Sequence, residues 1–227
     1  MIDRTKHEIV MKKILMDIYL HQSLASSLAF KGGTCLYFFY NLDRFSTDLD
    51  FNLRNDTFEV EQLNSIISKY LEISEFREKH FTWFWQGSYE KNSPKIKIEI
   101  SKRNFPDTYG VLNFYGTSVL AMNKDCMFAH KLCAIKDRNI LQNRDLYDAL
   151  FMFKNNFPIN NEIIKIRTGK DTAEYFKELI VYIEKTIKNK SSVLEGLGEV
   201  LDQKQKEWAK TNLLQQLIFE LSIRCNS

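Results

Sequence analysis

The chain has few of the residues that build disulfide frameworks or flexible linkers. It contains 4 cysteines and 3 prolines among 227 residues, and the cysteines form no Cys-x-x-Cys pair. Because histidines at zinc-ligand spacing are also missing, the sequence predicts neither disulfides nor a zinc site. The N-terminal segment lacks the apolar core of a signal peptide, and no apolar run reaches the ~20 residues of a membrane-spanning helix. We therefore expect a globular protein of the reducing cytoplasm.

An excess of charge of one sign is absent as well. Lysine and arginine number 32 against 29 aspartates and glutamates, which gives a formal net charge of +3. So small a charge neither indicates nor excludes a polyanionic partner such as RNA. The hydrophobic content of 44% is sufficient for a packed core.

Hydrophobic periodicity divides the chain into a mixed half and a helical half. The segments expected as strands are 28–31, 48–53, 80–85, 95–100 and 111–115. The segments expected as helices are 5–27, 33–40, 57–72, 171–188 and 207–224. The predicted fold class is therefore α/β (α+β), with a mixed domain over residues 1–118 and a helical domain over residues 119–227.

A glycine turn separates the first predicted strand from the helix that follows it. The turn consists of Lys31, Gly32, Gly33 and Thr34. The glycines would let backbone amides approach a triphosphate, and Thr34 with the helix N-terminus would add hydrogen bonds and a positive dipole end. An ordinary strand-to-helix turn uses the same glycines, so the neighbouring residues decide between the two interpretations.

Two aspartates follow this turn on the next predicted strand. Residues two apart in a strand face the same way, so Asp48 and Asp50 present their carboxylates together. Two such groups repel each other unless a hard cation or a basic partner neutralises them, which favours an Mg²⁺ or Mn²⁺ site. Glu99, on the alternating strand 95–100, is the candidate third ligand. The alternative is that these acids are simply solvated.

A second charged cluster lies in the helical half. It consists of Lys131, Arg138, Arg144, Asp145 and Asp148. Lys131 and Arg138 are seven apart, so a helix places them on nearly the same face, within reach of one extended anion such as a triphosphate. Asn143 is expected to cap the next helix, with Asp145 in its first turn. For Arg138, Arg144 and Asp145, structural ion pairs are an equally good interpretation.

Three blocks of the sequence together resemble a known family. They are residues 30–34 with 44–51, residues 96–100, and residues 130–138 with 144–148. In order and spacing they resemble the AbiEii/AbiGii nucleotidyltransferase-like toxins of the DNA polymerase β-like nucleotidyltransferase superfamily. The resemblance covers roughly residues 28–150. Thr47 departs from it, because many relatives have an acid there.

The resemblance implies a nucleotidyltransferase fold with a mixed-sheet catalytic domain and a helical C-terminal domain. It also implies Mg²⁺, a nucleoside triphosphate substrate, an RNA or tRNA acceptor, and a toxin that acts beside a separate antitoxin. The nucleotide-binding positions that it implies are Lys31, Gly32, Gly33, Thr34, Arg44, Ser46, Lys131, Arg138, Arg144 and Asp145. The implied catalytic positions are Asp48, Asp50, Glu99, Lys131 and Asp148, of which the first three would hold metal.

The leading hypothesis is an Mg²⁺-dependent transfer of a nucleoside monophosphate to RNA. Asp48, Asp50 and Glu99 would position metal, and Lys131 would neutralise the β- and γ-phosphates. A kinase that moves the γ-phosphate from the same triphosphate site is one alternative. A non-catalytic nucleotide-binding regulator is another, although such a protein would be expected to have lost these residues. The sequence does not specify the nucleotide, the acceptor, the antitoxin or the oligomeric state.

Overall fold

The computed structural model describes residues 3–55, 57–187, 189 and 192–225. The chain forms two compact units, Met1–Met122 and Asn123–Ser227. The expected boundary at residue 118 falls inside the last strand of the first unit, β7 (Thr117–Met122). The unit therefore ends where that strand ends.

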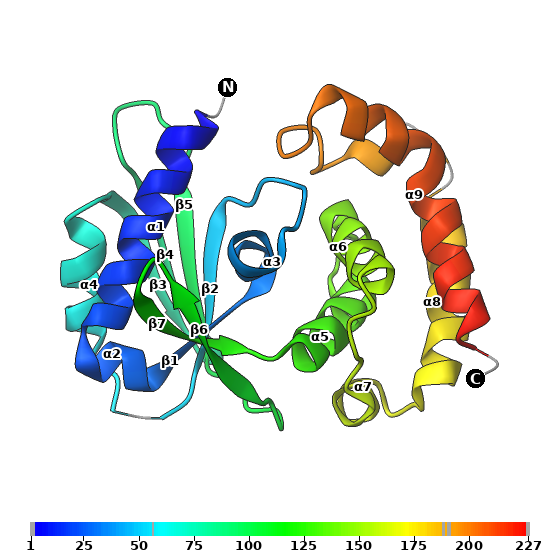
Figure 1. The fold of residues 1–227 in the computed structure, drawn as a ribbon, viewed down its shortest axis with the longest axis horizontal. Coiled ribbons are helices and arrows are strands. Elements are labelled where there is room, and N and C mark those ends of the chain that lie inside the picture. The colour runs from blue at the N-terminus through cyan, green and yellow to red at the C-terminus, as the bar shows by residue number, and fades with distance from the viewer. Residues whose placement is uncertain (1–2, 56, 188, 190–191, 226–227) are drawn as a thin grey trace. The chain divides into compact units, whose positions relative to one another are not determined.

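The first unit is built on one mixed sheet of seven strands in the order β3-β4-β5-β2-β1-β7-β6 (Figure 1). The strands are β1 (Leu28–Lys31), β2 (Asp48–Leu53), β3 (Glu72–Lys79), β4 (Thr82–Ser88), β5 (Ile96–Ser101), β6 (Tyr109–Phe114) and β7. The central strand β2 pairs antiparallel with β1 and parallel with β5. The helices among the described residues of this unit are α1 (Arg4–Leu20), α2 (Gln22–Ser27), α3 (Gly32–Tyr40) and α4 (Val60–Ser68). Helix α3 packs on β1 and β2, so it lies directly beside the strand that carries the two aspartates.

The alternation in β2 and β5 sorts their side chains onto two faces of the sheet. Leu49 and Phe51 are fully buried, as are Ile96, Ile98 and Ile100. Asp48 and Asp50 point to the other face, where Asp50 pairs in register with Glu99. This confirms that Asp48 and Asp50 share one face of β2 and that β5 alternates between buried isoleucines and the exposed Lys97 and Glu99.

Three features of the first unit differ from the sequence prediction. The helix expected over residues 5–27 is two helices, α1 and α2, which meet at His21. The helix expected over residues 57–72 ends at Ser68, and the chain enters β3, which was not predicted; β7 was missed as well. Strand β3 is rich in charge and mostly exposed, as edge strands commonly are, so it lacks the buried alternation that marks a strand in a sequence.

The second unit is helical throughout its described residues, as predicted. Its elements are α5 (Lys124–Asp137), α6 (Asn143–Lys154), α7 (Asn161–Thr168), α8 (Thr172–Thr186), a 3₁₀ turn (Ser192–Leu194) and α9 (Gln203–Ile223). The predicted helix 171–188 corresponds to α8, and its last residue lies outside the described part of the chain. No helix in the described ranges is long and apolar enough to cross a membrane.

Candidate active site

The glycine turn forms the junction between β1 and α3. Gly32 adopts φ +80°, a conformation that L-residues with a side chain rarely adopt. A Cβ atom at Gly32 would overlap the Asp50 carboxylate, and one at Gly33 would lie 2.7 Å from the Arg44 guanidinium. The positive φ favours glycine at position 32, whereas a Cβ at position 33 would require the end of the flexible Arg44 side chain to shift.

Thr34 and Ser46 connect the first turn of α3 to the start of β2. The Thr34 hydroxyl donates to the carbonyl of Asp48 and lies 2.9 Å from Ser46 Oγ. Thr34 is fully buried and Ser46 almost so. These contacts give Thr34 a part in positioning the aspartate strand, while contact of Thr34 or Ser46 with phosphate stays a prediction.

Basic side chains also lie at this turn. Arg44 is 3% exposed, and its Nη1 donates to the carbonyl of Phe45 at 2.9 Å. Lys31 ends β1 directly opposite Asp50 and is half-buried. The turn thus has cationic groups in the immediate neighbourhood of the aspartate strand, as a site for an anionic substrate requires.

The carboxylates of β2 suit a hard divalent cation. Asp48 and Asp50 share a face and both remain partly accessible to solvent. Mg²⁺ is usually held by one or two carboxylates together with substrate phosphates, and this pair supplies such a donor set. Within the described residues, no three His, Cys, Asp or Glu side chains form a ready metal cluster. Glu99 is exposed on the strand beside Asp50, so its role as third ligand stays a prediction.

His7 of α1 is a residue near this site that the sequence analysis missed. It is fully buried, and its Nε2 donates to the carbonyl of Thr47, the residue before Asp48, at 3.0 Å. Its Nδ1 has no hydrogen-bond partner among the described residues, and the rings of Phe45 and Tyr89 pack against it. Burial lowers the pKa of His7, which favours the neutral imidazole. The sequence predicted that His7 lies in a helix, but no motif indicated its contact with Thr47.

The second cluster is an ion network that joins α5 and its C-cap residue Arg138 to α6; its aspartates are buried, whereas the Arg138 side chain is 45% exposed. Lys131 Nζ lies 3.0 Å from Asp145 Oδ1 and 2.7 Å from Asp148 Oδ2. Arg138 Nε lies 2.9 Å from Asp145 Oδ2, an ion pair without the alignment of a hydrogen bond. Both aspartate side chains are 0% exposed, whereas the Lys131 side chain is 15% exposed. The ion-pair alternative that the sequence left open for Arg138 and Asp145 agrees with this geometry, whereas the functional roles expected for Lys131 and Asp148 stay predictions.

The start of α6 differs from the prediction. Asn143 does not cap the helix: Gln142 occupies the cap position and Asn143 is the first helical residue. The Asn143 side-chain amide instead donates to the carbonyls of Ser192 at 2.6 Å and Glu195 at 3.2 Å. Because these carbonyls lie about fifty residues further along the chain, capping rules based on neighbouring residues do not predict the contact. Arg144 lies in the first turn of α6 and is half-buried.

Comparison with known proteins identifies the family. The family model of the nucleotidyl transferase AbiEii toxin, of type IV toxin–antitoxin systems, matches residues 13–214. The chain belongs to the AbiEii family. The match reaches well beyond residues 28–150, into both α1 and the helices of the second unit.

Solved structures share the fold of this AbiEii protein. A nucleotidyltransferase candidate from H. pylori is 22% identical, with a TM-score of 0.57 and coverage of 96% of each chain. JHP933 from Helicobacter pylori is 21% identical, with a TM-score of 0.57 and coverage of 98% of this chain and 95% of the other. No curated protein matches the chain. Membership of the AbiEii family makes this protein a nucleotidyltransferase of the toxin–antitoxin type and confirms the resemblance found in the sequence.

Proposed function

We propose that this AbiEii protein transfers a nucleoside monophosphate from a nucleoside triphosphate to a hydroxyl of RNA, with tRNA as the favoured acceptor. The proposal includes Mg²⁺ dependence and a separately encoded antitoxin, since the family belongs to toxin–antitoxin systems. One observation carries the site assignment: Asp48 and Asp50 share an accessible sheet face, and the glycine turn touches Asp50.

In the first unit, different residues would bind the metal and the phosphates. Asp48 and Asp50 would hold the metal, with Glu99 as the further candidate. Bound there, Mg²⁺ would neutralise charge on the α-phosphate and favour ionisation of the acceptor hydroxyl. The backbone amides at Gly32 and Gly33 open α3, and with Lys31 and Arg44 they would bind phosphate oxygens. Thr34 and Ser46 would keep β2 in register with this turn.

In the second unit, support is stronger for a structural role than for triphosphate binding. Lys131 and Arg138 balance the charges of Asp145 and Asp148, so the four groups together are neutral. A neutral cluster attracts a triphosphate much less than two uncompensated cations would. We therefore propose that Lys131 first neutralises the buried aspartates. Contact of Lys131 with a β- or γ-phosphate oxygen stays a prediction.

Label position in the nucleotide tests the reaction. The purified protein is incubated with total RNA, Mg²⁺ and each α-labelled nucleoside triphosphate in turn, beside an Asp48→Asn variant. Asp17→Asn is the matched control, because Asp17 is an α1 carboxylate that pairs with Lys69 on the surface. Label in a discrete RNA band, present with the control and absent with Asp48→Asn, is expected. Transfer from γ-labelled nucleotide alone would identify a kinase, and nucleotide binding without any transfer would identify a regulator.

A further inference from the structure

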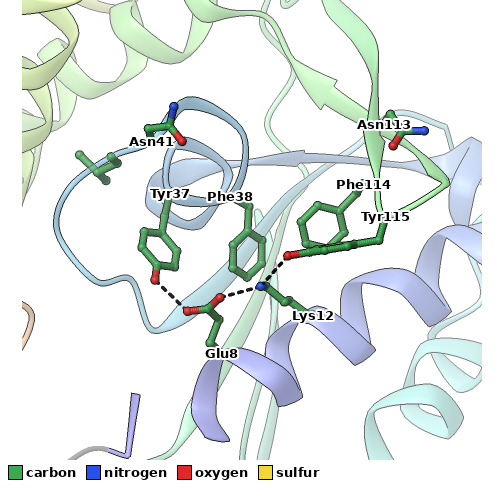
Figure 2. A pocket seen from close by; sticks show the side chains of 9 residues that line it. Glu8, Lys12, Tyr37, Phe38, Asn41, Asn113, Phe114 and Tyr115 are labelled. Atoms are coloured by element: carbon green, nitrogen blue, oxygen red, sulfur yellow. Dashed lines mark hydrogen bonds and ion pairs between the residues drawn. The ribbon is translucent and has the colours of Figure 1, made fainter. Parts of the chain in front are cut away.

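A pocket of about 550 Å³ in the first unit lies apart from the aspartate strand. Figure 2 shows it between α1, α3 and the tip of the β6–β7 hairpin. Its volume lies within the ~300–1,000 Å³ typical of small-molecule sites. It reaches Asn41, the C-cap of α3, whereas the glycine turn begins that helix. The lining residues Tyr37 and Phe38 are five and six residues beyond Gly32, so about 8–9 Å of helix at 1.5 Å per residue separates the pocket from the turn.

The polar wall of this pocket carries no net charge. Lys12 Nζ lies 2.6 Å from Glu8 Oε1 and donates to Tyr115 Oη at 3.0 Å. Tyr37 Oη donates to Glu8 Oε2 at 2.8 Å, which completes a chain of four groups (Figure 2). Because Glu8 compensates Lys12 within the wall, a phosphate would find no uncompensated cation here. The wall therefore suits a neutral ligand that exchanges hydrogen bonds.

Aromatic rings form the other part of the pocket. Phe38 and Phe114 are stacked, with centroids 5.2 Å apart and an interplanar angle of 29°. Tyr115 meets Phe114 edge-on at 4.9 Å, and Lys12 lies 5.0 Å from the Tyr115 ring centroid. Faces and edges of this kind accept a planar ring by stacking. Hydrogen-bonding groups beside stacked rings favour a heteroaromatic ligand over an aliphatic one.

Tyr115 is an unusual residue for its position in the hairpin. Phe114 pairs with Thr117, so Tyr115 and Gly116 form a two-residue turn, with φ values of +50° and +86°. Such turns prefer asparagine, aspartate or glycine at the first position, and a bulky residue there is unfavourable. Tyr115 is 68% exposed, so little burial offsets this cost. Residues that break a local rule are expected at functional sites.

We propose that this pocket binds a nucleobase, supplied either by an unpaired RNA residue or by a free nucleotide. The ring would stack against the aromatic side chains, as unstacked bases commonly do in proteins. Asn41 and Asn113 also line the pocket; Asn113 Oδ1 accepts from the Gly116 N–H at 3.2 Å, and the amide nitrogen of Asn113 and the Asn41 side chain would exchange hydrogen bonds with a base edge. Because the pocket contains none of the aspartate-strand residues, base binding does not depend on the transfer reaction.

Calorimetric titration of the full chain, without metal or triphosphate, tests this proposal. The probes are the four nucleosides and short single-stranded RNA homopolymers. Tyr115→Asn removes the ring and introduces a residue that the turn prefers, so the hairpin is expected to persist. Tyr115→Phe keeps the ring and removes only the hydroxyl. Phe81→Asn is the matched control, because Phe81 is an exposed aromatic residue at the tip of the β3–β4 hairpin.

Saturable binding is expected with the unaltered protein, with Phe81→Asn and with the inactive Asp48→Asn. Tyr115→Asn is expected to weaken it about tenfold or more, and Tyr115→Phe to retain most of it. Nucleosides that bind as well as the oligonucleotides would identify a free nucleotide as the source of the base, and binding of oligonucleotides alone would identify an RNA strand. The proposal is overturned if no probe binds, if Tyr115→Asn binds normally, or if Phe81→Asn loses as much affinity. Loss of transfer in Asp48→Asn with base binding intact would separate this pocket from the proposed reaction.

Discussion

The two units of this protein each carry a pair of aspartates on one face of an element, and the two pairs differ in access. Asp48 and Asp50 lie two apart on a strand and remain partly open to solvent. Asp145 and Asp148 lie three apart on a helix and are fully buried against Lys131. Two pairs of identical side chains that each share a face therefore differ in the ions they can bind. An open pair can take a cation and a phosphate from solution, whereas a sealed pair needs its cation from the chain itself.

The largest expected effect tests the open pair. Asp48→Asn keeps the shape of the side chain and removes one charge from the proposed metal site, so transfer should fall by about 1,000-fold or more. The free energy of unfolding should change little, because the side chain is only half-buried. Initial rates with α-labelled nucleotide and urea unfolding measure the two quantities. Asp48→Asn with full activity would assign Asp48 the structural role that we give to Asp145.

The next effect tests the sealed pair. Lys131→Met leaves two buried carboxylates without their shared cation, which should lower the free energy of unfolding by about 3–5 kcal/mol. The matched control is Lys136→Met on the same helix, because Lys136 pairs with Glu178 at the surface. That change should cost less than about 1 kcal/mol. If both variants unfold at the same urea concentration, the buried network contributes no special stability.

A smaller effect tests the link between the glycine turn and the open pair. Gly32→Ala forces a side chain into φ +80° and into the Asp50 carboxylate, so it should cost about 1–3 kcal/mol and reduce transfer. Gly169→Ala is the control, since Gly169 has φ +73° with open space around it. It should show the backbone cost of about 1 kcal/mol without loss of transfer. Equal activity in the two variants would mean that Asp50 tolerates displacement.

The smallest effect concerns the pH dependence of stability beside the aspartate strand. Burial lowers the pKa of His7 below its ordinary value of 6.5, so the unfolded chain binds more protons than the folded one as pH falls through 6.5. Stability should therefore fall towards acid pH, by at most about 1.4 kcal/mol per pH unit for this one proton, and level off below the folded pKa. His7→Gln keeps a donor for the Thr47 carbonyl and should show a shallower decline. Urea unfolding of both proteins between pH 5 and 8 measures the difference, and parallel curves would contradict it.

Local patterns in the sequence were sufficient for some elements and not for others. The alternation of Ile96, Ile98 and Ile100 predicted β5 and its exposed Glu99, because one face of that strand is sealed by the core. Strand β3 lies at an edge and is dominated by charged residues, so the period-2 signal is weak there. For the candidate site, the sequence indicated the glycine turn and the aspartates. It did not indicate His7, which reaches Thr47 across forty residues.

The sequence by itself determined which residues share a face, because the periods of strands and helices are fixed by backbone geometry. It thereby paired Asp48 with Asp50 and carried enough of the AbiEii pattern to indicate the family, whereas Arg138, expected on one helix with Lys131, lies at the C-cap just beyond the end of α5. Only the tertiary structure decided which carboxylates are sealed and which stay open, since burial depends on what packs over each face. It also decided that Thr34 binds the β2 backbone and that Tyr115 closes a pocket with Lys12. Those contacts join residues distant in the chain, and no local period encodes them.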